Sequence, residues 1–180
     1  DPFTNLSLEK SIAKIKSRNI FSQVTSKVKN GSSDDLKIID INVEEKPTGE
    51  ISAGFGIGTN GGTLAFNVQE NNWLGDGKKV GFDIAASKDT ISGTLSYTNP
   101  NYDFLGNSIN YSLSSVSNDK PEQGYENKLI NAGIGTSFEQ YKDVYANIGL
   151  SATYDDLKTS SEASDSLKKQ SGKFNELAGN

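Results

Sequence analysis

Apolar and polar residues alternate with a period of two from about residue 50 to residue 155. Such alternation is typical of β-strands that bury one face and hydrate the other. Turn-forming residues interrupt it at residues 60–62, 75–77, 88–89 and 99–100. The pattern therefore predicts consecutive antiparallel strands that are joined as hairpins.

Seven strands are expected from this pattern. In the first, Ile51, Ala53, Phe55 and Ile57 alternate with Ser52, Gly54, Gly56 and Gly58. The other six are expected around residues 64–73, 80–87, 91–98, 108–114, 130–138 and 144–153. A polar loop is expected from Ser117 to Tyr125.

The second face of these strands favours a membrane barrel over a soluble β-sandwich. It carries Gly, Ser, Asn and Thr rather than Lys and Glu, and the strands approach the ~9–11 residues that cross a bilayer. Aromatic residues lie toward the strand ends, as in an interfacial girdle: Trp73, Tyr97, Tyr102, Tyr141 and Tyr154. A sandwich that serves as an adhesion module stays as the alternative of a different class. Because single-chain bacterial barrels have an even strand count, seven strands indicate a fragment of a longer protein.

The first 49 residues follow a different pattern. Leu8, Ile12 and Ile15 recur at helical spacing, with Asn5 available as the N-cap. Two strands are expected at residues 20–29 and 36–45, around a turn at residues 30–33. The order helix, strand, turn, strand predicts a small α+β unit. After Asp155 the pattern weakens, and Ala163, Leu167 and Phe174 leave a short helix or a mobile polar loop equally open.

Composition excludes most catalytic chemistry. The chain has no Cys and no His, so a disulfide, a thiol nucleophile and an imidazole base are absent. Residues 50–155 hold six basic and twelve acidic residues, which disfavours nucleic acid as a partner. Inward-facing Glu50, Glu70 and Asp83 are better explained as solvated lumen residues than as an acid/base pair. No enzyme activity and no cofactor or metal is expected.

The glycines Gly54, Gly56 and Gly58 permit two interpretations. They do not form a phosphate-binding loop, because they lead into a turn and a second strand rather than into a helix. They either leave room inside a crowded lumen or weaken the first strand, since glycine adds backbone entropy and has no side chain to pack. The residues alone do not decide between the two.

Several segments resemble the BamA family of bacterial outer-membrane barrel-assembly factors. They are residues 43–50 with Gly54, Gly56 and Gly58, residues 1–3 and 8–11, residues 21–24, residues 71–77 and residues 99–100. The resemblance implies a mainly β chain, the N-terminal half of an antiparallel transmembrane β-barrel preceded by a partial α+β POTRA domain. It implies a periplasmic POTRA portion at 1–48, about seven barrel strands at 49–155 and an extracellular loop at 156–180.

The resemblance also implies a function. The first barrel strand would pair with strands of substrate barrels along a lateral seam formed by Glu50, Ile51, Ser52, Ala53, Gly54, Phe55, Gly56, Ile57, Gly58 and Thr59. The expected partners are unfolded outer-membrane β-barrel proteins, accessory periplasmic lipoproteins and outer-membrane lipid. The expected location is the outer membrane, with the N-terminal segment in the periplasm. A two-partner secretion or related translocation barrel that exports a polypeptide is the alternative, and a porin is the third possibility.

Overall fold

The fold is given by a computed structural model that describes residues 3–33, 36–58, 61–103, 105–141 and 144–179. The chain divides into two compact units, Asp1–Thr48 and Gly49–Asn180. In chain order the elements are α1 (Asn5–Lys16), β1 (Phe21–Asn30), β2 (Lys37–Glu45), β3 (Gly49–Gly58), β4 (Gly61–Trp73), β5 (Lys78–Ser87), β6 (Thr90–Asn99), β7 (Ser108–Lys120), η1 (Pro121–Gln123), β8 (Tyr125–Tyr141), β9 (Val144–Thr159), α2 (Asp165–Gln170) and β10 (Gly172–Gly179).

The first unit contains α1 and the antiparallel pair β1 and β2, so the predicted order of helix, strand, turn and strand is confirmed. The predicted N-cap, Asn5, is wrong. Thr4 has extended backbone angles and its Oγ1 accepts a hydrogen bond from Ser7 N at 3.1 Å, so the helix begins one residue earlier. Ile20 and Val24 are the buried apolar residues of the part of this unit that the structure describes.

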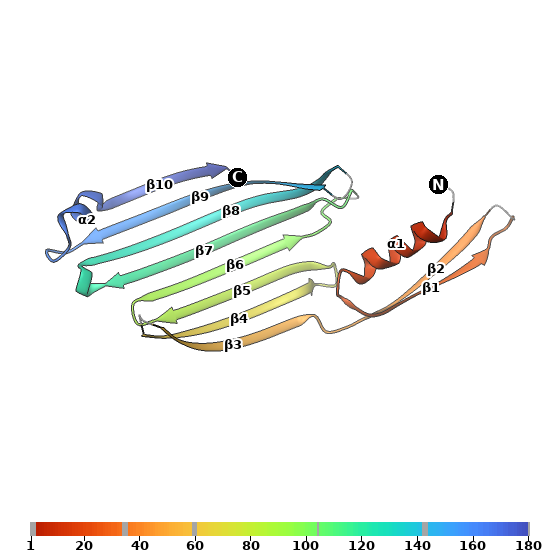
Figure 1. The fold of residues 1–180 in the computed structure, drawn as a ribbon, viewed down its shortest axis with the longest axis horizontal. Helices are drawn as coiled ribbons and strands as arrows, with labels where there is room; N and C mark the ends of the chain where they lie inside the picture. Colours follow the sequence, from red (N-terminus) through yellow and green to blue (C-terminus); the bar gives the residue numbers. More distant parts are fainter. Residues whose placement is uncertain (1–2, 34–35, 59–60, 104, 142–143, 180) are drawn as a thin grey trace. The chain divides into compact units, whose positions relative to one another are not determined.

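The second unit is one antiparallel sheet of eight strands in the order β10-β9-β8-β7-β6-β5-β4-β3 (Figure 1). All seven predicted strands are present as β3 to β9. The expected polar loop at residues 117–125 is largely wrong, because β7 continues to Lys120 and β8 begins at Tyr125. Alternation fails there because polar residues occupy both faces, yet the ladder continues through the pair Lys120 and Tyr125.

The tail after residue 155 also differs from the expected loop. Strand β9 continues to Thr159, and α2 forms at Asp165–Gln170, near the predicted short helix. Residues Gly172–Gly179 then form β10, an eighth strand that pairs with β9. Phe174 is part of this strand and not of the helix, so residues 156–180 are not a single loop.

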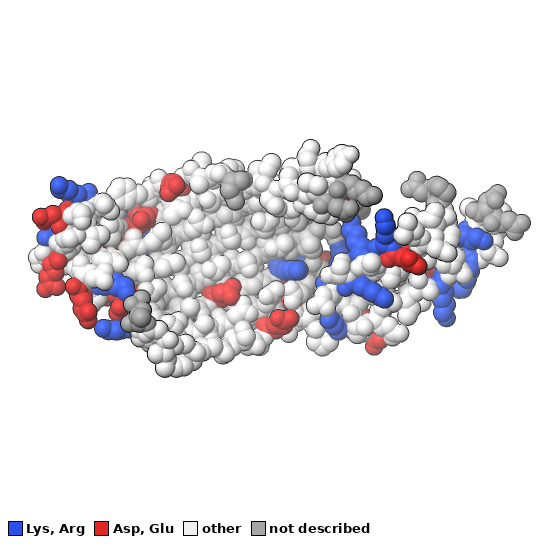
Figure 2. Space-filling view, in the orientation of Figure 1, with Lys and Arg blue, Asp and Glu red and all other residues white. Residues whose placement is uncertain are grey.

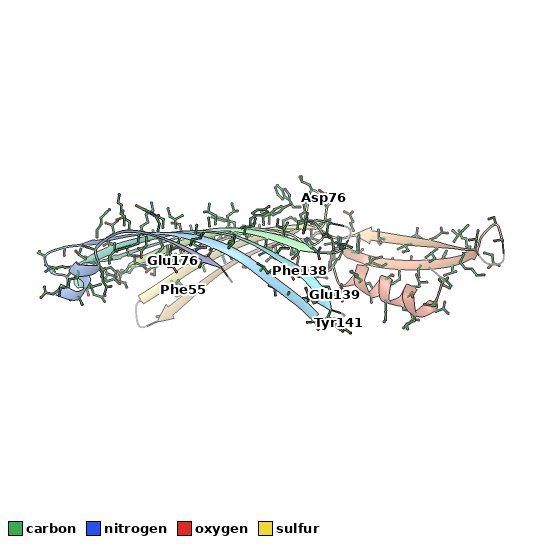
Figure 3. The ribbon with its side chains drawn as sticks, turned by 90° about the horizontal axis from the view of Figure 1, so that it is seen from above. Phe55, Asp76, Phe138, Glu139, Tyr141 and Glu176 are labelled. Atoms are coloured by element: carbon green, nitrogen blue, oxygen red, sulfur yellow. The ribbon has the colours of Figure 1, made fainter. Side chains whose placement is uncertain are left out.

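The strand register sorts the side chains of the sheet onto two faces. One face is apolar, as in the row Ile51, Val68, Phe82, Leu95 and Leu113, and the other is polar, as in the row Ser52, Asn67, Asp83, Thr94 and Ser114. Side chains project from both faces of the curved sheet (Figure 3).

No large apolar side chain is buried among the described residues of this sheet, and Ile51 and Ile57 are 75% and 81% exposed. A soluble sheet would cover such a face with a second layer. Within the described residues of this sheet, no second layer covers the apolar face. None of the helices in the described ranges is long and apolar enough to cross a membrane.

Candidate functional site: the edge strand β3

Strand β3 lies at one end of the sheet, and within the described residues β4 is the one strand that it pairs with. The ladder is regular from Gly49 opposite Glu70 to Gly58 opposite Gly61. All ten residues of the strand are exposed. An edge strand of this kind presents a row of unpaired N–H and C=O groups that another strand can complete.

The structure brings the predicted seam residues together on this one edge. Ile51, Ala53, Phe55 and Ile57 share the apolar face with Val68, Phe66 and Leu64 of β4. The alternate residues occupy the polar face: Glu50, Ser52, Gly54, Gly56 and Gly58. Thr59, the last predicted seam residue, lies outside the described residues.

The glycines of β3 occupy open space. A Cβ atom added at Gly54, Gly56 or Gly58 would meet no atom within 4 Å. On the same face in the middle of the sheet, added Cβ atoms would meet close neighbours. A Cβ atom added at Gly81 would lie 2.6 Å from Ser96 Oγ, and one added at Gly133 would lie 2.8 Å from Ser112 Oγ. Within the described sheet, the β3 glycines therefore do not serve to make room.

The carboxylates do not form a catalytic pair. Asp83 lies on the polar face and accepts a hydrogen bond from Asn67 Nδ2 at 2.6 Å. Glu50 lies in a different cross-strand row, with Gln69 and Gly81, which is two residues along the strands from the row of Asp83. The prediction that Glu70 faces inward is wrong, because Glu70 lies opposite Val80 on the apolar side. Its Oε1 accepts the Asn72 N–H at 2.7 Å and so caps the following turn.

Charge is sparse on this sheet. Figure 2 shows single acidic side chains scattered over it, well apart from one another, and more charges grouped at one end. Within the described residues, no three Asp, Glu, His or Cys side chains are placed to hold a metal ion. What the site offers chemically is therefore backbone hydrogen bonding along an open edge.

Comparison with known proteins identifies the fold. Residues 72–180 match the Omp85 superfamily domain. The outer membrane protein assembly factor BamA of Neisseria meningitidis serogroup B is 28% identical over 116 residues, which are 62% of this chain and 13% of that protein. The crystal structure of BamA from Haemophilus ducreyi lacking POTRA domains 1–3 matches with a TM-score of 0.74 at 20% identity, covering 97% of this chain and 36% of that chain.

The fold is that of the N-terminal half of an antiparallel transmembrane β-barrel, preceded by a small α+β unit. The chain belongs to the Omp85 superfamily. The resemblance to BamA that the sequence indicated is thereby confirmed, and the chain spans only a small part of the length of the BamA proteins it matches.

Two features of the sheet were not predicted from the sequence. The first is β10, in which Phe174 and Leu177 lie on opposite faces, so that apolar and polar residues do not alternate along the strand. The second is the difference between open glycines in β3 and crowded glycines elsewhere, which depends on strands that are distant in the sequence. No local signal could have revealed that difference.

Proposed function

We propose that the complete protein assembles and inserts β-barrel proteins into the bacterial outer membrane, with β3 as the strand on which substrate strands are templated. The observation that carries this proposal is that β3 is the first strand of the sheet, with β4 as its one partner among the described residues and with open space on its polar face at Gly54, Gly56 and Gly58. The similarity to a protein named outer membrane protein assembly factor supports it.

The physical basis is hydrogen bonding in lipid. A strand that enters the bilayer has backbone N–H and C=O groups that lipid cannot satisfy, at a cost of several kcal/mol for each group. An edge strand already in the membrane supplies these partners by β-augmentation. No bond of the substrate is made or broken, so the proposed activity is not enzymatic.

The seam consists of Glu50, Ile51, Ser52, Ala53, Gly54, Phe55, Gly56, Ile57, Gly58 and Thr59. The three glycines favour this use because they leave the polar face of the strand without side chains that would pack across to a neighbour. Such a strand exchanges partners more readily than one that is rich in β-branched residues.

The remaining parts of the proposal concern location and partners. Residues 1–48 would be a partial POTRA domain in the periplasm, the sheet would lie in the outer membrane, and the segment around α2 would be extracellular. The partners would be unfolded outer-membrane β-barrel proteins, accessory periplasmic lipoproteins and outer-membrane lipid.

Disulfide crosslinking tests the templating. Single cysteines are placed along residues 50–58 of the complete protein, and one cysteine is placed in the terminal strand of an unfolded substrate barrel. Because paired strands repeat every two residues, crosslinks should form at alternate positions of β3. The Cα atoms must approach to ~4.4–6.8 Å for a disulfide to close. A cysteine at Gly54 or Gly56 is well tolerated, since its Cβ meets open space.

Ser151 and Thr153 of β9 are the matched controls. Each has a partner on both sides, Gly133 and Ala178 for Ser151, and Asn131 and Glu176 for Thr153. Cysteines there should not react with substrate. Equal crosslinking of β3 and β9, or none on β3, would contradict templating and would favour the secretion barrel.

A further inference from the structure

The turn between β4 and β5 has an unusual conformation. Asp76 N–H donates to Trp73 O at 3.3 Å, which closes a four-residue turn with Leu74 and Gly75 at its centre. Both central residues have positive φ, 58° for Leu74 and 78° for Gly75. Positive φ at both central positions is the pattern of a type I′ turn, which strongly prefers Asn, Asp or Gly at the first of them.

Leucine is a poor choice for this backbone position. The left-handed region is sterically unfavourable for an L-residue other than Gly, Asn or Asp, because the Cβ atom comes too close to the following carbonyl oxygen. The other non-glycine residue with positive φ among the described residues is Asn19, a type that tolerates this region. The apolar side chain of Leu74 also gains little from packing within the protein, because the residue is 80% exposed.

Neighbouring contacts hold the turn in this conformation. Asn72 Oδ1 accepts the Gly77 N–H at 2.7 Å, and Glu70 Oε1 accepts the Asn72 N–H at 2.7 Å. The Lys78 ammonium lies 2.7 Å from the Asp76 carboxylate. Hydrogen bonds and an ion pair between residues of the turn therefore stabilise the backbone conformation in which Leu74 is exposed.

The turn continues the apolar face of the sheet. Trp73 is paired with Lys78, which lies on the same face as Val80 and Phe82, and Trp73 is 46% exposed. In the next strands the same end of this face carries Tyr97 and Tyr111, whose ring centres are 6.0 Å apart. Trp and Tyr at the end of a lipid-facing band mark the level of the lipid headgroups.

We propose that the β4–β5 turn is a membrane anchor, in which Leu74 inserts beside Trp73 into the interfacial layer of the lipid leaflet at this end of the barrel. The partner is lipid because Trp73 lies on the lipid-facing side of the sheet, at the end that also carries Tyr97 and Tyr111. Transfer of the exposed leucine side chain from water into lipid is favourable and offsets the cost of its backbone conformation.

The anchor requires that the apolar face contacts lipid, but it does not require that β3 templates substrates. A failed crosslink to substrate would leave the anchor intact. A turn that stays in water would leave the templating intact.

Spin-label accessibility tests the anchor. A nitroxide is attached to cysteine in Leu74→Cys of the complete protein, reconstituted in vesicles of phosphatidylcholine and phosphatidylglycerol. Collision with oxygen, which concentrates in the acyl region, is compared with collision with a water-soluble nickel chelate. The matched control is Asp76→Cys in the same turn, whose carboxylate belongs in water. The ratio of oxygen to nickel accessibility should be several-fold higher at position 74 than at position 76.

A second measurement avoids the apolar label. Lipids brominated near the glycerol end of the acyl chain should quench Trp73 fluorescence, isolated by subtracting the signal of Trp73→Phe. Leu74→Asn keeps the turn conformation and should reduce this quenching. Equal accessibility at positions 74 and 76, or a label at 74 that both reagents fail to reach, would overturn the proposal. The second result would mean that protein rather than lipid covers Leu74.

Discussion

Replacing Ile84 with arginine in the complete protein is expected to destabilise the barrel strongly, whereas changes to its neighbour Asp83 are expected to be nearly silent. Ile84 lies between Phe66 and Gly93 on the apolar face and is 39% exposed. Asp83 lies between Asn67 and Thr94 on the polar face. Adjacent residues of one strand should therefore respond in opposite ways.

The magnitude follows from the depth of Ile84. It lies four positions along β5 from Val80, which is paired with Tyr97 at the interfacial end of the face. At ~3.3 Å per residue this is about 13 Å along the strand, or roughly 9 Å of depth for a tilt of ~45°. An arginine at the midplane of a barrel costs about 2–4 kcal/mol, and less toward the interface. We expect Ile84→Arg to lower the free energy of unfolding by about 2–3 kcal/mol.

Unfolding by guanidinium in lipid vesicles, followed by tryptophan fluorescence and by heat-modifiable migration on gels, measures this free energy. Asp83→Asn should change it by less than about 0.5 kcal/mol, since Asn67 can still donate to the new amide oxygen. Thr94→Arg is the matched control, because it adds the same charge on the other face opposite Asp83.

A surface ion pair there is worth at most about 1 kcal/mol, so Thr94→Arg should not destabilise the barrel. Equal losses for Ile84→Arg and Thr94→Arg would refute the assignment of the two faces. A loss for Asp83→Asn that matched Ile84→Arg would do the same.

Three further predictions concern single residues outside the lipid-facing side chains. Gly54→Val should raise the free energy of unfolding by about 0.5–1 kcal/mol, whereas Gly133→Val should lower it by about 1–3 kcal/mol by overpacking. The two differ because only the side chain added at position 133 meets a close neighbour. Guanidinium titrations of the same kind measure both free energies. Gly124 has a φ of 72°, and a Cβ there would overlap the backbone nitrogen of Ala163. Gly124→Ala should therefore detach the segment around α2 and speed its cleavage in limited proteolysis, and an unchanged cleavage rate would contradict this packing. Burial acts to raise the pKa of Asp103, but hydrogen bonds to its carboxylate from the backbone and side chain of Asn107 outweigh this effect, so the pKa is lowered. These hydrogen bonds are fully formed above the ordinary Asp pKa of ~3.9 and are lost as the pH falls through the lowered pKa of Asp103. Amide exchange in this turn, corrected for its intrinsic rate, should therefore rise as the pH falls through that lowered pKa. The Asp103→Asn variant should show no such rise.

The sequence by itself determined the strands and their faces. Successive side chains of a strand point to opposite sides whatever surrounds them, so the alternation of Ile84 with Asp83 is readable without any partner. Turns such as the one at residues 75–77 are readable for a similar reason, because glycine supplies backbone angles that other residues avoid. These properties depend on neighbours in the chain.

Only the tertiary structure decided where each strand lies and what surrounds it. Gly54 and Gly133 look alike in the sequence, yet one lies at an open edge and the other against Ser112. The ends of β7 and β8 pair through polar residues that carry no alternation, and β10 is held by its ladder with β9. Leu74 adopts a conformation that its residue type disfavours, because Glu70 and Asn72 hold the turn. Each of these features depends on contacts made in space, which a local pattern of apolar and polar residues does not encode.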